Sequence, residues 1–149
     1  GAMPTLCGWA AAMNTLDFGA WVLFAILFAW QHPHFYAIAW IYRKDYEKAG
    51  YKMLSVVDKS GSRLFLQILL FSLLLLAVSL LPTFMEISGW LYFSGALILG
   101  LYVMIAGFQF VVRPTVRDAR RLLLSTIIYL PMLLVVILAD QALMSLLLA

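Results

Sequence analysis

The chain has 149 residues, of which 65% are hydrophobic and 11% charged, and its mean hydropathy is +1.00. Soluble globular domains carry about twice this share of charged residues, so the composition excludes that class and indicates an integral membrane protein. The formal net charge is only +3, and no nucleic-acid partner is expected.

The positive charge is distributed unevenly along the chain. All ten Lys and Arg residues lie in two windows, Arg43–Arg63 and Arg113–Arg121. Two apolar runs separate these windows, so both basic loops are expected on the same face of the bilayer. The positive-inside bias makes that face the cytoplasm or the mitochondrial matrix. The sequence therefore predicts a protein of the bacterial cytoplasmic membrane or the mitochondrial inner membrane.

The apolar segments predict the helices. Gly1–Met13 is too short to cross a bilayer and is interpreted as the end of a helix. Four later stretches approach or exceed the roughly 20 residues that a membrane-spanning helix needs. They are Ala20–Tyr42, Leu64–Leu81, Trp90–Val112 and Leu122–Ala139. The predicted fold class is all-α, a polytopic transmembrane bundle with four complete spans plus the end of a fifth, in one membrane domain over residues 1–149.

Small residues in the third predicted span favour tight packing between helices. Ala96, Gly100 and Gly107 lie in that span, and side chains of this size let two helices approach closely within a membrane. This pattern predicts packing and carries no functional content.

The first predicted span contains polar residues at a depth where they are costly. Gln31, His32 and His34 surround Pro33 in this segment. They either hydrogen-bond to neighbouring helices or face a functional cavity, and both interpretations stay open. If the helix continues past Tyr42, eleven residues bring His34 and Asp45 to one helix face about 16 Å apart. A substrate with a charged head near Asp45 could then reach His34 with an apolar body.

The first basic loop mixes acids and bases just inside the membrane. Its simplest interpretation is a solvated loop that contacts lipid headgroups. The chemical interpretation is a diphosphate site, in which Asp45 holds a Mg²⁺ ion that bridges phosphate oxygens. The remaining phosphate charge would be neutralised by Arg43, Lys44, Lys48 and Lys52. Glu47 is set aside, because two residues along a helix place it on the face opposite Asp45.

A series of short motifs occurs in order along nearly the whole chain. They are Gly1-Ala-Met-Pro4, Gly8-Trp9-Ala-Ala, Trp30-Gln-x-Pro33-His34-Phe35, Lys44-Asp45-Tyr46, Ala49-Gly50, Met53-Leu54-Ser55-Val56 and Arg117-Asp-Ala-Arg-Arg121. Each motif is weak alone, but their ordered combination resembles the protoheme IX farnesyltransferase (heme O synthase) family. That family is a branch of the UbiA superfamily of intramembrane prenyltransferases.

The resemblance implies a fold and a reaction. The fold would be a nine-helix bundle, of which this chain would form the C-terminal half. The reaction would transfer farnesyl from farnesyl diphosphate to a vinyl group of heme B, giving heme O, with Mg²⁺ at the diphosphate and water supplying the new hydroxyl. The family's first acidic motif belongs to helices that this chain lacks. The chain alone is therefore expected to be inactive and to need the missing N-terminal helices or a partner chain.

The resemblance also implies roles for individual residues. Asp45, Arg43 and Lys52 would be catalytic, with Asp45 at the metal and the two bases at the diphosphate. Substrate-binding roles would belong to His34, Gln31, Lys44, Lys48 and Tyr46, with His34 on the heme side. The family's loop usually carries more aspartates than the single Asp45 seen here.

Two alternative functions and one local ambiguity remain. The chain could belong to another UbiA-type enzyme that prenylates a quinone precursor or chlorophyll, although the Trp-Gln-x-Pro-His run and the sparse acids argue against this. It could also be a non-catalytic membrane subunit that binds heme or lipid. In the second basic loop, Arg117, Arg120 and Arg121 share a helix face that would bind heme propionates or anionic lipid, and lipid is favoured.

Overall fold

The computed structural model describes residues 1–58 and 60–147, and every regular element in these ranges is a helix. Four of the helices are long and apolar enough to cross a membrane, which confirms the predicted all-α fold with four spans. The elements are α1 (Met3–Met13), α2 (Phe18–Ile41), α3 (Arg43–Lys48), α4 (Leu54–Val57), α5 (Ser62–Phe84), α6 (Trp90–Val112) and α7 (Val116–Leu147).

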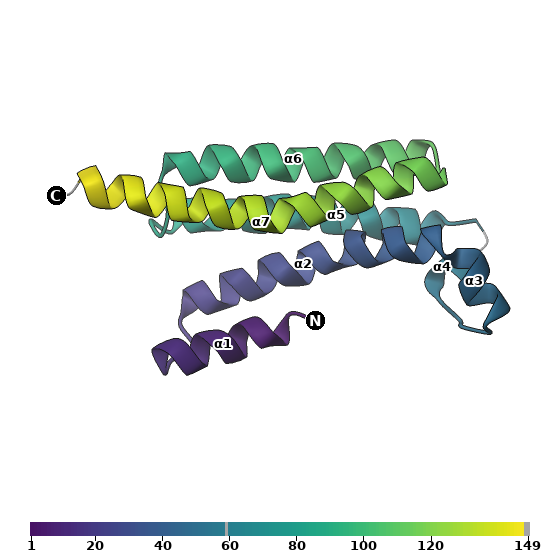
Figure 1. Cartoon of the computed structure of the whole chain (residues 1–149), viewed down its shortest axis with the longest axis horizontal. Coiled ribbons are helices and arrows are strands. Elements are labelled where there is room, and N and C mark those ends of the chain that lie inside the picture. Colours follow the sequence, from purple (N-terminus) through teal and green to yellow (C-terminus); the bar gives the residue numbers. More distant parts are fainter. Residues whose placement is uncertain (59, 148–149) are drawn as a thin grey trace.

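The four long helices form a bundle. Contacts run from α2 to α5, from α5 to α6, from α6 to α7 and from α7 back to α2, so each long helix packs on two others. Helix α1 lies against the first half of α2, while α3 and α4 lie at the far end of the bundle (Figure 1). The same end carries the turn between α6 and α7. Both basic loops therefore lie at one end of the molecule; which side of the membrane that end faces stays a prediction.

Carboxylates fix the beginnings of three long helices. Asp17 accepts a hydrogen bond from the backbone N–H of Ala20 at 3.3 Å at the start of α2. Asp58 accepts from Arg63 at 2.7 Å at the start of α5. A hydrogen bond from Ser60 is the main reason why the pKa of Asp58 lies below its ordinary value. At the start of α6 the carboxylate comes from α7 instead: Asp140 accepts from Gly89 at 2.6 Å and from Tyr92 at 3.1 Å.

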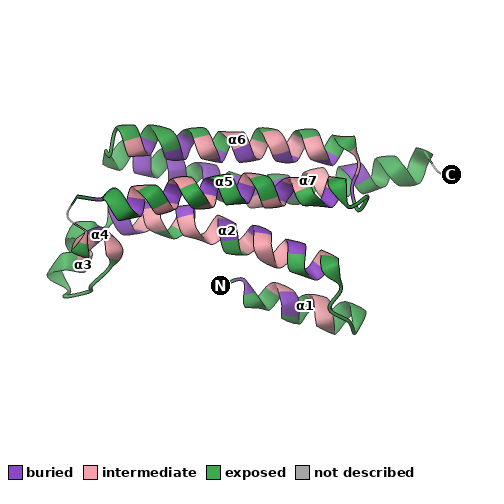
Figure 2. Ribbon diagram, turned by 180° about the vertical axis from the view of Figure 1, so that it is seen from behind, coloured by how far each residue is buried: buried purple, intermediate pink, exposed green. Residues whose placement is uncertain are grey.

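Polar contacts also join the long helices deep in the core. The Tyr92 hydroxyl of α6 donates to the Ser79 carbonyl of α5 at 2.8 Å. The Ser79 hydroxyl in turn is hydrogen-bonded to the Tyr129 hydroxyl of α7. Buried residues face the inside of the bundle, and the outward surfaces of the helices are exposed (Figure 2). Because lipid offers no hydrogen-bond partners, such contacts stabilise one arrangement of α5, α6 and α7.

The long helices extend beyond several of the predicted span limits. Helix α5 begins at Ser62 and continues to Phe84 with Pro82 inside it. Helix α7 begins at Val116 and runs through Asp140 to Leu147. Hydropathy marks only the segment that is apolar enough for the hydrocarbon core, whereas the helices continue through the polar residues at either end. The short segment at the beginning of the chain is helical as well, in α1; that it ends a fifth span stays a prediction.

Candidate active site

A polar pocket lies where α2 gives way to the first basic loop. It has a volume of about 230 Å³ and is lined by Arg43, Lys44 and Glu47 of α3 and by Ser55 and Val56 of α4. We refer to it as the α3–α4 pocket. Two cationic side chains and one carboxylate thus meet at the basic end of an otherwise apolar bundle.

Two contacts position this pocket against the end of α2. The buried Ser55 hydroxyl donates to the Ala39 carbonyl at 2.9 Å, which holds α4 against α2. The Arg43 guanidinium lies 4.3 Å from the centre of the buried Trp40 ring, in a cation–π contact. The Arg43 head is thereby held beside the apolar core, where a phosphate group would find both charge and N–H donors.

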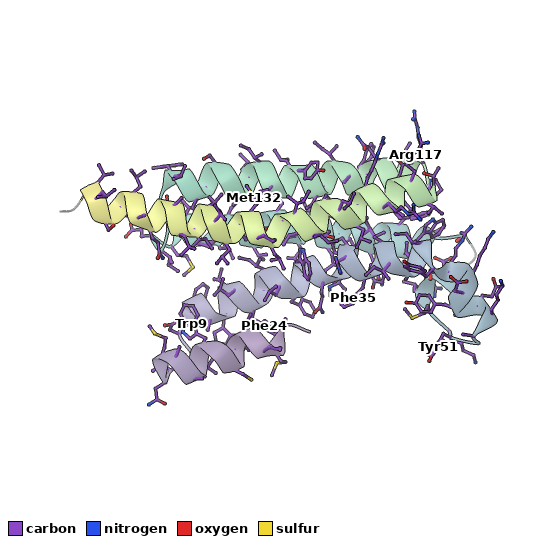
Figure 3. All side chains as sticks on the ribbon, viewed as in Figure 1. Trp9, Phe24, Phe35, Tyr51, Arg117 and Met132 are labelled. Atoms are coloured by element: carbon purple, nitrogen blue, oxygen red, sulfur yellow. The ribbon has the colours of Figure 1, made fainter. Side chains whose placement is uncertain are left out.

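The structure brings only part of the predicted diphosphate site together. Arg43 and Lys44 line the α3–α4 pocket, whereas Asp45, Lys48 and Lys52 are exposed and do not line it. The Tyr46 ring meets Tyr51 edge-on at 6.2 Å, outside the same lining. Tyr51 extends from the loop at the end of the molecule, far from the α7 side chain Met132 (Figure 3).

Glu47 is the lining residue that sequence reasoning set aside. It is two residues from Asp45 on α3, so the two carboxylates point to different sides of that helix. The structure places Glu47 in the pocket and Asp45 outside it. No sequence signal distinguished the two, because the side that faces α4 depends on how the loop folds back.

The predicted face shared by His34 and Asp45 is wrong. It required one continuous helix, but α2 ends at Ile41, and α3 begins as a separate helix at Arg43. Tyr42 between them has φ −99° and ψ 15°, outside the helical region, and its N–H closes the last turn of α2 on the Ile38 carbonyl at 3.0 Å. The direction of the chain changes here, so helical spacing cannot be counted across Tyr42.

The polar residues within α2 face different neighbours. The His34 Nδ1 atom lies 3.0 Å from the Thr126 hydroxyl of α7, and the His34 ring stacks on Trp30 at 4.6 Å between centres. Trp30 also donates to the Thr126 carbonyl at 2.7 Å. His32 instead stacks on Phe71 of α5 at 3.6 Å and bonds the Phe28 carbonyl through Nδ1 at 2.7 Å.

These contacts favour the packing interpretation for both histidines. The two rings lie against different helices and do not converge on one ligand. Gln31 is half-buried on the same helix. Sequence reasoning missed Thr126, the residue of α7 that contacts both Trp30 and His34, because nothing in its local sequence distinguishes it from an ordinary helix threonine.

The donor atoms near the pocket suit a metal that is shared with a ligand. Within residues 1–58 and 60–147, no group of three or more His, Cys, Asp or Glu residues could hold a metal ion. Mg²⁺ is commonly bound by one or two carboxylates together with phosphate oxygens and water. Asp45 and Glu47 point to different sides of α3, so the segment offers one carboxylate to such an ion, and it fits Mg²⁺ only where phosphate oxygens and water supply the other ligands.

Comparison with known proteins extends across almost the whole chain. Residues 1–146 match the UbiA prenyltransferase family. The chain is similar to "Protoheme IX farnesyltransferase" of Solibacter usitatus (strain Ellin6076), with 45% identity over 95% of this chain and 48% of that protein. It is similar to the protein of the same name from Marinobacter nauticus, with 46% identity over 95% of this chain and 46% of the relative.

A more distant relative is "Protoheme IX farnesyltransferase, mitochondrial" of Homo sapiens, which is 38% identical over 93% of this chain and 31% of that protein. The chain spans about half the length of the bacterial relatives that it matches. No solved structure matches the chain significantly. The protein is integral to the membrane, with four apolar helices of spanning length. Since the family match runs from Gly1 to Leu146, the chain belongs to the UbiA prenyltransferase family.

Proposed function

We propose that this chain is part of an enzyme that transfers a farnesyl group from farnesyl diphosphate to a vinyl group of heme B, which yields heme O. The observation that carries the proposal is the α3–α4 pocket, where Arg43 and Lys44 lie together at the basic end of an apolar bundle. A prenyl diphosphate needs this combination, because its head carries concentrated negative charge and its tail is hydrocarbon. The names of the similar bacterial and human proteins support heme as the acceptor.

In the proposed reaction the C1–O bond of farnesyl diphosphate breaks, and its electron pair leaves with the diphosphate. The π electrons of the heme vinyl group form the new carbon–carbon bond to farnesyl C1. Water adds to the remaining cationic carbon and releases a proton, which leaves the hydroxyl of heme O. The negative charge that develops on the leaving diphosphate is the charge that a protein can stabilise with fixed cations.

Arg43 is the residue of this chain that is best placed for that role. Its guanidinium can bind two phosphate oxygens at once, and its contact with Trp40 orients it before substrate arrives. Lys44 adds a second positive charge in the same pocket. Either Asp45 or Glu47 would hold Mg²⁺, which supplies further positive charge at the diphosphate. Lys48, Lys52 and Tyr46 would contact the substrate from the surrounding segment. A heme-side role for His34 and Gln31 stays a prediction, because the contacts of His34 with Trp30 and Thr126 favour packing.

The rest of the proposal concerns partners and location. Farnesyl diphosphate and heme B would be the substrates, surrounded by membrane lipids. Helices beyond those of this chain, from the same protein or a partner, would complete the site. The basic loops would face the cytoplasm in a bacterial cytoplasmic membrane, or the matrix in a mitochondrial inner membrane.

Substitution of Arg43 tests the proposal in the complete membrane enzyme. Arg43→Ala should lower kcat/KM for heme O formation about 10²- to 10³-fold, the usual cost of removing one group that stabilises transition-state charge. Heme O is measured by chromatography of extracted hemes. Arg120→Ala is the matched control, since Arg120 is exposed near the beginning of α7 and the variant should retain activity. Equal activity of both variants would exclude a diphosphate role for the pocket.

A pair of carboxylate substitutions identifies the metal-binding residue. Asp45→Ala should abolish turnover if Asp45 holds Mg²⁺, and Glu47→Ala should do so if the pocket carboxylate does. The magnesium concentration at half-maximal activity should rise in the variant that has lost a ligand. Near-normal heme O formation by both variants would mean that the first basic loop is a solvated loop that contacts lipid headgroups and holds no metal. A prenylated quinone precursor as product would instead favour the other UbiA-type activity.

A further inference from the structure

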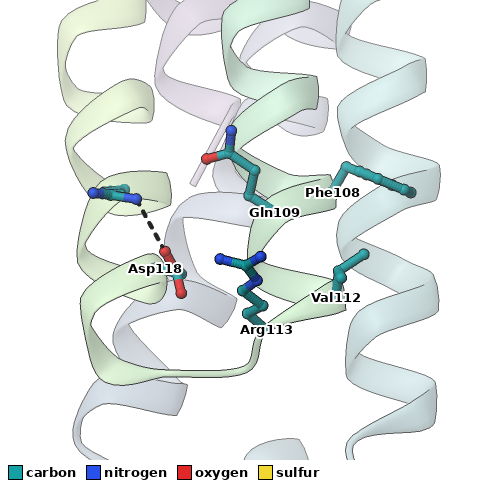
Figure 4. A pocket seen from close by; sticks show the side chains of 6 residues that line it. Phe108, Gln109, Val112, Arg113 and Asp118 are labelled. Carbon is teal, nitrogen blue, oxygen red and sulfur yellow. Dashed lines mark hydrogen bonds and ion pairs between the residues drawn. The ribbon is translucent and has the colours of Figure 1, made fainter.

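A second polar pocket lies at the same end of the bundle, at the turn between α6 and α7. Its volume is about 320 Å³, and its polar lining consists of Gln109, Arg113, Asp118 and Arg121. Phe108 and Val112 of α6 form its apolar wall (Figure 4). We refer to it as the α6–α7 pocket; its lining shares no residue with that of the α3–α4 pocket.

The charges in this pocket leave a net positive potential. The Asp118 carboxylate is occupied by two contacts, one from the Thr115 hydroxyl at 2.6 Å and one from Arg121 at 3.3 Å. Among residues 1–58 and 60–147, the Arg113 guanidinium has no ion-pair partner. Figure 4 shows Gln109 and Arg113 on one side of the hollow and Asp118 on the other. The pocket thus offers an amide and two guanidinium groups to one anion.

Two further hollows adjoin this pocket along α6, and each shares at least one lining residue with it. One has a volume of about 380 Å³, shares Phe108 with the pocket, and is lined only by apolar side chains of α5 and α6, among them Leu69, Leu73 and Met104. The other has a volume of about 220 Å³ and shares Gln109 and Arg121 with the pocket. It runs along α6 past Ala106 and Tyr102. Ile105 lies between the two hollows and lines both.

We propose that the α6–α7 pocket binds the phosphate of an anionic phospholipid, whose two acyl chains lie in the two hollows on either side of Ile105. The headgroup phosphate would sit among Gln109, Arg113 and Arg121, at the depth where the basic loops meet the membrane surface. Phosphate esters of one hydrocarbon chain, such as a prenyl diphosphate, share the head chemistry. A forked pair of hollows below one charged pocket fits a diacyl lipid better.

The arrangement separates specific binding from the general attraction of basic loops to anionic membranes. Arg117 and Arg120 lie in the first turns of α7 and carry the same charge, but neither lines the α6–α7 pocket. The side chain of Arg117 extends away from the bundle at this end (Figure 3). Non-specific attraction would weaken equally when any of the four arginines of this region is neutralised. A phosphate bound in the pocket depends on Arg113 and not on Arg117.

Native mass spectrometry of the full protein, extracted and delipidated in detergent, tests this directly. Phosphatidylglycerol is titrated against the wild-type protein, Arg113→Gln and the charge-matched control Arg117→Gln, with phosphatidylcholine as the uncharged-head comparison. We expect Arg113→Gln to weaken binding of the first phosphatidylglycerol about ten- to a hundredfold, which corresponds to the loss of one charge-assisted contact. Arg117→Gln should change it less than twofold. Gln109→Leu, which leaves every charge in place, should also weaken it.

Three results would overturn the proposal. If Arg113→Gln and Arg117→Gln weakened phosphatidylglycerol binding equally, the binding would depend only on the total positive charge at this end of the bundle. Equal binding of phosphatidylcholine and phosphatidylglycerol would exclude recognition of an anionic head. If farnesyl diphosphate displaced phosphatidylglycerol from the wild-type protein but not from Arg113→Gln, the pocket would be assigned to a prenyl diphosphate instead. None of these results depends on whether the α3–α4 pocket is catalytic, because heme O formation is not measured.

Discussion

The side chain of Asp140 in α7 forms hydrogen bonds to the beginning of α6. It is only 2% exposed, and it accepts the N–H groups of Gly89 and Tyr92 that the first turn of α6 leaves without a helical partner. A carboxylate so placed satisfies two donors where water has little access. The end of α7 and the beginning of α6 are therefore held together by hydrogen bonds as well as by packing.

Replacement of Asp140 should weaken this junction. Asp140→Ala leaves both N–H groups without an acceptor and should lower the free energy of unfolding by about 1–3 kcal/mol. Asp140→Asn keeps one oxygen acceptor and should cost less. Thermal unfolding in detergent measures both, with Asp17→Ala as control, because the Asp17 contact at the exposed start of α2 is longer at 3.3 Å. A smaller loss for Asp140→Ala than for Asp17→Ala would contradict this account.

At the residue scale, the basic side chains of the pocket were easier to predict than the carboxylate that faces it. Arg43 and Lys44 were predicted as phosphate contacts and do line a pocket, since basic residues beside a membrane span have few other places to lie. The choice of Asp45 over Glu47 rested on motif resemblance and stays a prediction. Which carboxylate faces α4 depends on how α4 packs back on α2, through contacts such as that of Ser55 with Ala39, and such a contact leaves no local signal in the sequence.

The close approach of α5 and α6 depends on glycine. A Cβ atom added at Gly100 would lie 2.6 Å from Cδ1 of Leu76 and 3.4 Å from its Cα. The helices thus come together where one of them carries no side chain, as the small residues of this span predicted. Gly8 of α1 differs, because an added Cβ there meets nothing within 4 Å among the described residues.

Gly100→Leu should therefore push α5 and α6 apart, while Gly8→Leu should be tolerated. Overpacking of this kind typically costs about 1–3 kcal/mol. Unfolding of the two variants in mixed detergent micelles gives the difference in stability. Equal midpoints for Gly100→Leu and wild type would mean that Leu76 moves aside without cost and that the close approach is not needed.

At the scale of elements, the spans were predictable and the breaks were not. A long apolar run has one stable conformation in lipid, so four helices follow from hydropathy. The end of α2 at Ile41 lies where the chain leaves the membrane and water competes for the backbone. Near water, the hydrogen-bonding needs of the backbone are met equally well by a turn at Tyr42 and by a continued helix. Tertiary contacts such as that of Arg43 with Trp40 accompany the turn, and hydropathy does not register them.

The whole molecule places both basic loops at one end, and this arrangement predicts a topology. In a Cys7→Ser background, the single variants Lys48→Cys and Arg117→Cys should react with an impermeant thiol reagent from the same side of the membrane. A cysteine at Glu86, between α5 and α6, should react only from the opposite side. Labelling of intact and inverted vesicles measures the side from which each cysteine reacts. Labelling of the Lys48→Cys and Arg117→Cys variants from opposite sides would contradict the placement of both basic loops at one end of the bundle.

The length of α7 links the protein to the thickness of its membrane. Helix α7 has 32 residues and is about 48 Å long, whereas the hydrocarbon core of a bilayer is about 30 Å thick. The turns after Asp140 still expose apolar side chains, with Leu146 and Leu147 each 76% accessible. Tilting the bundle keeps these turns out of water, and a thin bilayer demands more tilt than a thick one. The resting orientation of both pockets relative to the membrane surface is thus set partly by the host lipid.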